Sequence, residues 1–232
     1  MKYKRVLIKL SGEFLAKDNN TGIDFDKLLS LADIIKSNVE KGIQIAIVVG
    51  GGNFWRGRSN TVMDSTTSDH IGMLATTMNA LALGDALIQR GVDVRVQTSI
   101  EMKQISEPYI RNRALKHLDK NRVVIFGCGT GSPFFSTDTA AALRAAEINA
   151  DIILKATNVD YVYTKDPRKY TDFEIIKETS HLRVIKDKLR VMDLTAISLC
   201  MENNIHIDQT KTPIIVPKTF LLFKVAPRLT LK

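Results

Sequence analysis

Short apolar runs alternate with longer segments of helical periodicity through the first 154 residues, and this alternation limits the possible folds more than any other feature. The first helical segment has Asp24 as a candidate N-cap and Gly42 as a candidate stop. Repeated β-α-β units join parallel strands through right-handed connections. The pattern therefore predicts an α/β fold, a three-layer sandwich around a mostly parallel open sheet, with strands expected at 5–10, 43–49, 92–97, 122–126 and 151–154.

The chain has 232 residues and contains no Pro/Gly/Ser-rich linker, internal repeat or low-complexity tract. One domain is therefore expected over residues 1–232. The helices between the strands are expected near 24–41, 68–90, 109–118 and 139–148. After residue 154 the pattern changes to an irregular loop or hairpin at 158–170, followed by two short helices near 185–189 and 194–203.

Three of the expected strands end in glycine-marked turns: Ser11-Gly12, Gly50–Asn53 and Gly129–Asp138. Glycine at the end of a buried strand lets backbone N–H groups approach a ligand without a Cβ in the way. Neighbouring parallel strands share one crevice at their carboxyl ends. The three turns together predict a site for a ligand with several phosphates, although any one alone would be an ordinary turn.

Charged residues flank these turns. Lys9 lies inside an apolar strand, so its ammonium either meets an anion at the strand end or reaches the surface along its stem. Lys155 ends another strand in a similar position, and Arg56 after the second turn is a candidate phosphate clamp. Asp69 is either an N-terminal helix carboxylate or a partner for ribose hydroxyls. Asp138 is either a helix cap or a residue that orients Lys9 or holds Mg²⁺ through water.

The composition favours a soluble protein: 44% of the residues are hydrophobic, and no apolar run of about 20 residues or signal-peptide core is evident. The two cysteines, Cys128 and Cys200, have no metal-ligand spacing and are expected to be free thiols in the cytoplasm. The net charge of +8 fits nucleic-acid binding, a polyanion pocket or a lysine-rich surface. No Walker A loop or dinucleotide-binding fingerprint is present.

Six segments, taken together, resemble the bacterial uridylate kinases of the amino-acid-kinase family over roughly residues 3–205. They are Lys9–Gly12, Gly50–Asn53 with Arg56-Gly57, Asp69–Thr76, Thr130–Asp138, Leu154–Thr157 and Val191–Leu194. The resemblance implies ATP-dependent phosphorylation of UMP to UDP in pyrimidine biosynthesis, with Mg²⁺, in a homohexamer. It also implies a monophosphate half at about 1–150 and an ATP half at about 151–232.

The resemblance further implies roles for individual residues. Those assigned to catalysis are Lys9, Asp138 and Asp193, with Mg²⁺ held through nucleotide phosphates and no direct protein ligand. Those assigned to ATP are Lys9, Leu10, Ser11, Gly12, Gly52, Arg56, Thr157, Asn158, Tyr163 and Asp166. Those assigned to UMP are Gly51, Asp69, Thr130, Gly131, Ser132, Pro133, Phe134, Phe135, Ser136 and Thr137. From the residues alone, Phe134 and Phe135 are candidates for core packing or base stacking, and Asp193 also fits a helix N-terminus.

The chain departs from the family pattern after Ile205, where residues 206–232 lack the expected sequence. Gly84 and Ile88 stand where basic residues would serve GTP activation in the family, so a weak or altered GTP response is expected, while inhibition by UTP stays open.

Three other functions remain open at this point. They are a related kinase acting on a carboxylate, carbamate or isoprenoid phosphate, a basic nucleic-acid-binding regulator, and an inactive scaffold.

Overall fold

The structure is a computed structural model that describes residues 3–17, 21–57, 62–157, 162–163, 173–176, 178–189, 191–211 and 229–231. Its α-helices are α1 (Phe25–Val39), α2 (Ser65–Gln89), α3 (Arg111–Asp119), α4 (Thr137–Glu147), α5 (His181–Lys186) and α6 (Leu194–Glu202), with a 3₁₀ helix η1 at Gly12–Leu15. Its strands are β1 (Arg5–Leu10), β2 (Gln44–Val49), β3 (Val94–Thr98), β4 (Glu107–Pro108), β5 (Val123–Gly127), β6 (Ile152–Thr157), β7 (Val162–Tyr163), β8 (Ile175–Ile176), β9 (Glu178–Thr179), β10 (His206–Lys211) and β11 (Leu229–Leu231).

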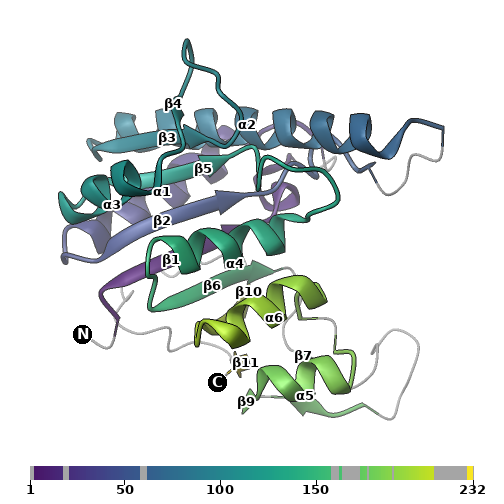
Figure 1. The fold of residues 1–232 in the computed structure, drawn as a ribbon. Coiled ribbons are helices and arrows are strands. Elements are labelled where there is room, and N and C mark those ends of the chain that lie inside the picture. Colours follow the sequence, from purple (N-terminus) through teal and green to yellow (C-terminus); the bar gives the residue numbers. More distant parts are fainter. Residues whose placement is uncertain are drawn as a thin grey trace.

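Nine of the described strands form one sheet, in the order β4-β3-β5-β2-β1-β6-β10-β11-β9 (Figure 1). Every pairing in this sheet is parallel except that of β10 with β11. The chain builds outward from β1 to β2 and beyond, and later returns to place β6 on the other side of β1. Strand β1 is therefore the point at which the strand order reverses, and such a point is where open α/β sheets bind ligands.

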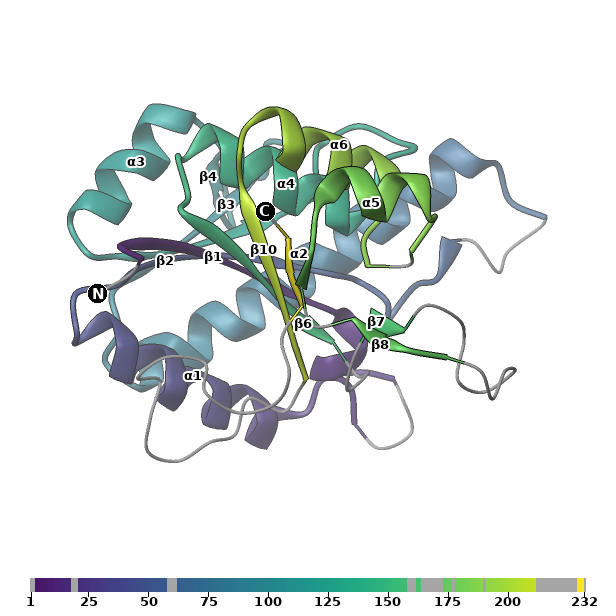
Figure 2. The same ribbon diagram turned by 90° about the horizontal axis from the view of Figure 1, so that it is seen from below.

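Helices cover both faces of the sheet, as the alternation of strands and helices predicts. Helices α3, α4, α5 and α6 lie along one face and α1 along the other (Figure 2). Two apolar clusters correspond to these faces. One contains Ala114, Ala141 and Ala196 from α3, α4 and α6. The other contains Leu28 from α1 and Leu83 from α2. The expected three-layer α/β sandwich is confirmed.

Side-chain caps fix several helix starts. Asp24 caps α1 by accepting a hydrogen bond from the Lys27 amide at 3.0 Å, as expected. The expected start of α2 near residue 68 is wrong, because Asp64 caps this helix four residues earlier and places Asp69 inside it. The interpretation of Asp138 as a cap is also wrong. Ser136 is the N-cap of α4, and Asp138 lies in its first turn.

The chain after Ile205 continues the sheet despite its unusual sequence. Strand β10 pairs in parallel with β6 from His206 to Lys211, and β11 pairs antiparallel with β10. The two-residue strands β4, β8 and β9 were not expected from the sequence. Among the described residues, α2 is long and apolar enough to cross a membrane, contrary to the sequence expectation; 56% of its most apolar window is buried inside the fold, as in a core helix.

Candidate active site

The second and third glycine turns open into one cavity of about 880 Å³ at the carboxyl ends of the central strands. Lys9 of β1, Gly51 and Gly52 after β2, and Gly129 and neighbours after β5 all contribute to its walls. The prediction of a shared crevice at this edge of the sheet is confirmed for the second and third turns, whereas Ser11 and Gly12 of the first turn do not line the cavity. The remaining walls come from α2, from the start of α4, and from residues 188–189 and 191–194 before and at the start of α6.

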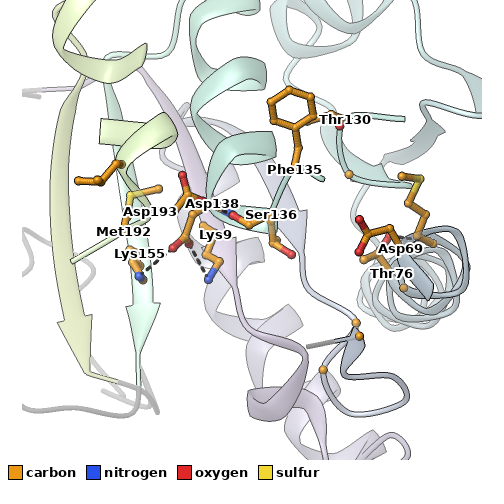
Figure 3. Close-up of a pocket in the computed structure, with 18 of the residues that line it drawn as sticks. Lys9, Asp69, Thr76, Thr130, Phe135, Ser136, Asp138, Lys155, Met192 and Asp193 are labelled. Atoms are coloured by element: carbon orange, nitrogen blue, oxygen red, sulfur yellow. Dashed lines mark hydrogen bonds and ion pairs between the residues drawn. The ribbon is translucent and has the colours of Figure 1, made fainter. Parts of the chain in front are cut away.

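Two lysines and one aspartate form the charged centre of this cavity (Figure 3). Lys9 and Lys155 are direct register partners on the adjacent strands β1 and β6. The Asp138 carboxylate lies between them, with Oδ1 2.9 Å from the Lys9 Nζ and Oδ2 3.3 Å from the Lys155 Nζ. All three side chains are at most 16% exposed. The buried lysines meet an anion, as predicted for Lys9, and that anion is Asp138.

The charges in this cluster depend on one another. Burial alone would raise the pKa of Asp138, but the ammonium groups of Lys9 and Lys155 hold that pKa below its ordinary value. Burial lowers the pKa of Lys155; Asp138 opposes this shift, while the Lys9 charge adds to it. Two ammonium groups thus share the Asp138 carboxylate, and the charge of Asp193 also favours the protonated form of Lys155.

Asp193 lines the same cavity, but its carboxylate already has several partners. It caps α6 by accepting from the Ala196 amide at 2.8 Å, and it accepts from the Ser136 hydroxyl and from the Thr139 hydroxyl at 3.0 Å. Asp193 therefore joins the N-terminus of α4 to that of α6. Lys155 adds a second link by donating to the Val191 carbonyl.

The Gly50–Asn53 turn packs closely against η1 and α2. A Cβ on Gly12 would lie 2.5 Å from the Gly52 nitrogen, and a Cβ on Gly51 would lie 2.9 Å from the Gly72 carbonyl. Asn53 and Asn79 are buried and exchange amide hydrogen bonds at 2.7 and 3.0 Å. Because a Cβ at Gly12 or Gly51 would collide with these atoms, only glycine lets the turn pack this closely against η1 and α2.

The loop that follows β5 forms the opposite wall. Thr130, Phe135, Ser136 and Thr137 line the cavity, and Asp69 accepts a hydrogen bond from the Phe134 amide at 2.7 Å. Asp69 and Thr76 face the cavity from α2 (Figure 3).

The other residues of this loop are placed differently. Phe134 is 76% exposed, which excludes core packing for its ring. Ser132 lines an adjoining cavity of about 650 Å³ between α4 and α6, which also includes Thr130 and Phe135. Gly131 and Pro133 contribute to neither cavity.

Several expected site residues lie beside the cavity and do not line it. Leu10 is 1% exposed and belongs to the apolar core, and Ser11 caps η1 by accepting from the Phe14 amide. Arg56 is paired with Glu13 at 2.9 Å and donates to the Gly52 carbonyl. Asn158 and Asp166 lie outside the described residues, as do the side chains of Thr157 and Tyr163.

Sequence reasoning did not assign part of the wall that α2 provides. Its cavity-lining residues recur three or four positions apart, which is the spacing of one helix face: Ser68, Asp69, Gly72, Met73 and Thr76. Small and polar residues on one face of an otherwise apolar helix could have indicated, from the sequence alone, that this face lines a cavity. Also unassigned were Trp55 and Gly57 near the second turn, and Lys188, Leu189, Val191, Met192 and Leu194 before and within α6.

The cavity combines backbone turns with three lysines and three aspartates, and the Lys9–Asp138–Lys155 cluster lies among them. The sequence profile of the amino acid kinase family matches residues 4–208. This chain belongs to the amino acid kinase family. The matched region of this kinase contains the whole charged cluster and all three glycine turns.

Two solved structures show how far the similarity of this kinase extends. The UMP kinase from Bacillus anthracis is 35% identical, with a TM-score of 0.91 over 99% of this chain and 96% of that chain. The UMP kinase from Ureaplasma parvum is 36% identical, with a TM-score of 0.91 and full coverage of both chains. The similarity therefore includes the region after Ile205 that departs from the expected sequence.

Proposed function

We propose that this kinase transfers the γ-phosphoryl group of ATP directly to UMP, forming UDP for pyrimidine nucleotide biosynthesis. The observation that carries the proposal is the Lys9–Asp138–Lys155 cluster in one cavity with two of the glycine turns. The similarity to two UMP kinases over essentially the full chain supports the choice of acceptor.

The cavity suits this reaction because the acceptor needs little activation. The second pKa of a phosphate monoester is about 6, so near neutral pH the acceptor is already largely a nucleophilic dianion. What remains is to bring two anions into line and to stabilise the charge that spreads over the transferred group. The ammonium groups of Lys9 and Lys155 and the backbone amides of the glycine turns supply positive potential for both tasks.

Magnesium would accompany the nucleotide. The described residues offer no cluster of three or more His, Cys, Asp or Glu side chains that could hold a metal ion. Two of the acidic residues that line the cavity, Asp138 and Asp193, suit a Mg²⁺ ion that keeps several waters and is bound mainly by substrate phosphates. When bound, the ion would neutralise charge on the phosphates of ATP.

The two halves of the cavity divide between the two nucleotides in this proposal. The Gly129–Thr137 loop, with Gly51 and Asp69, would hold UMP. Lys9, with the backbone of Ser11, Gly12 and Gly52, would hold the ATP phosphates. Arg56 would have to exchange its Glu13 partner for a phosphate. The adenosine end would lie toward the segment after β6, which includes Thr157, Asn158, Tyr163 and Asp166.

We further propose a cytoplasmic homohexamer that responds weakly to GTP and has UTP as a candidate inhibitor. The weak response is supported by the charges near the end of α2. Arg95 pairs with Asp93 at 2.6 Å and with Glu107 at 3.7 Å, and Arg122 pairs with Asp93 at 2.7 Å, so two carboxylates already balance the two arginines. Gly84 and Ile88 add no positive charge there.

The test is a coupled assay of ADP formation from ATP with each nucleoside monophosphate, using the wild-type chain and Lys9→Ala. UMP is expected to be the preferred acceptor, and Lys9→Ala to reduce turnover by at least roughly two orders of magnitude, as for other groups that stabilise transition-state charge. Phosphorylation of a carboxylate with no activity on UMP would contradict the proposal. Equal rates for the two proteins would contradict the role of Lys9.

A further inference from the structure

Arg144 is a buried charge close to the cavity that the phosphoryl-transfer chemistry does not use. It lies on α4 and is 3% exposed. Its guanidinium stacks on the Tyr109 ring, with Cζ 3.8 Å from the ring centroid, and its Nη1 donates to Glu147 at 2.5 Å. Tyr109 donates its hydroxyl hydrogen to the same Glu147 oxygen at 2.6 Å. Burial of a guanidinium costs stability unless such partners surround it, so this pocket is built for an arginine.

The Nη2 side of the Arg144 guanidinium contacts Ser99 and the loop after β5. Nη2 of Arg144 donates to the Ser99 hydroxyl at 2.8 Å. Ser99 in turn donates to the Gly129 carbonyl at 2.8 Å, and Arg144 Nη2 also reaches that carbonyl at 3.5 Å. Gly129 lines the cavity. A continuous path of hydrogen bonds therefore runs from a buried ion pair to the cavity wall.

The loop needs such support because of its backbone conformation. Cys128, Gly129 and Gly131 have φ values of 61°, 55° and 84°. The left-handed conformation is unfavourable for Cys128, which carries a Cβ, and such conformations persist only where the surroundings fix them. Thr76 holds the first residue by accepting from the Cys128 amide at 2.8 Å. The Ser99–Arg144 pair holds the next residue, Gly129, from the other side.

We infer that Arg144 is a positioning residue for the acceptor nucleotide, acting through Ser99 on the Gly129–Thr130 turn. The inference rests on the proposed function, which assigns that wall to UMP. Neither residue lines the cavity, so neither acts as a catalytic residue. The effect should concern the acceptor and spare ATP, because the hydrogen bonds that Ser99 and Arg144 make within the described part of the chain lead to Gly129 and not to Lys9 or the Gly50–Asn53 turn.

Ser99→Ala is the primary test, since it removes one hydroxyl and leaves the Arg144–Glu147 pair in place. Loss of one hydrogen bond to the Gly129 carbonyl should raise the KM for UMP about 3- to 10-fold, with kcat changed less than about twofold and the KM for ATP unchanged. Arg144→Lys keeps a positive charge beside Glu147 but lacks the planar fork that also reaches Ser99. It should raise the KM for UMP to a similar extent.

Two comparisons separate positioning from a general loss of stability. Asn38→Ala removes a buried amide on α1, which donates to the Ile34 carbonyl far from the loop in the fold. This control should lower the unfolding temperature and leave both KM values unchanged. Because Arg144 and Ser99 act through one path, the Ser99→Ala/Arg144→Lys double variant should show less than the product of the two single effects.

The outcomes are distinguishable. A wild-type chain that does not phosphorylate UMP overturns the proposed function and this inference with it. If the wild type is active, unchanged KM values in Ser99→Ala, an equal rise for both substrates, or fully multiplicative effects in the double variant overturn the positioning role alone. Binding can be followed separately through the fluorescence of Trp55, the single tryptophan, which lines the cavity.

Discussion

Replacement of Asp138 by asparagine tests the electrostatic picture of the site most directly. The carboxylate is the shared counterion of Lys9 and Lys155, at 2.9 and 3.3 Å, and the three side chains are 16%, 11% and 14% exposed in that order. Asparagine keeps the size of the side chain and removes the charge. Two neighbouring buried ammonium groups then lose the one carboxylate that both contact, and Lys155 keeps only its charge interaction with Asp193.

The size of the effect follows from these distances. At about 3 Å and an effective dielectric constant of about 20, each pair attracts by about 5 kcal/mol, and the desolvation of the three groups offsets much of this. Removing one partner of a buried ion pair typically costs about 3–5 kcal/mol. For a chain of this length, about 1 kcal/mol corresponds to about 2–4 °C in Tm. We expect Asp138→Asn to lower Tm by about 6–20 °C, toward the low end if Lys155 releases its proton.

The assay is thermal unfolding with and without ATP. Triphosphate supplies the negative charge that the variant lacks, so ATP should raise the Tm of Asp138→Asn more than that of the wild type. Asp187→Asn is the matched control, because Asp187 pairs with Arg183 at 3.2 Å on the exposed surface, where such pairs contribute little. A Tm loss no larger than that of the control, or a smaller ATP effect than in the wild type, would refute the reasoning.

Two further predictions concern the acid range and the glycine turn. Because the pKa of Asp138 is lowered in the folded chain, its stabilisation is present above its ordinary value of 3.8 and is lost as the pH falls through the folded-state pKa. Urea unfolding should therefore show the stability difference between wild type and Asp138→Asn shrinking between about pH 5 and pH 2; a constant difference would contradict this. Gly12→Ala places a Cβ 2.5 Å from the Gly52 nitrogen and should lower stability by about 1–3 kcal/mol. Gly72→Ala on α2 meets only the Trp55 ring at 3.8 Å and should fold at least as stably, so equal Tm values for the two variants would contradict the packing argument.

Local sequence signals predicted an element correctly where a single residue, such as a helix cap, determines where the element begins. Asp24 caps α1 as its position suggested. The start of α2 was missed because Asp64 is followed by Ser65, Thr66 and Thr67, which resemble a polar loop. The short strands β8 and β9 have no alternating pattern, since two residues are too few to show one. β8 pairs with β7, the preceding strand, whereas the position of β9 comes from pairing with the distant β11, which no local window contains.

The geometry of the charged cluster also could not be predicted from local sequence alone. The sequence indicated that Lys9 needs an anion and that Asp138 stands at a helix start, and it offered their pairing as one alternative. The sequence also placed Lys155 at the end of a strand, but it indicated no partner for this lysine. That Lys9 and Lys155 are register neighbours depends on β6 returning to the free edge of β1, after three other strands have been added beyond β2. Once that strand order is known, two like charges meet at the point where the order reverses. The first turn of α4 then provides their counterion, and the position of the site follows from topology and charge together.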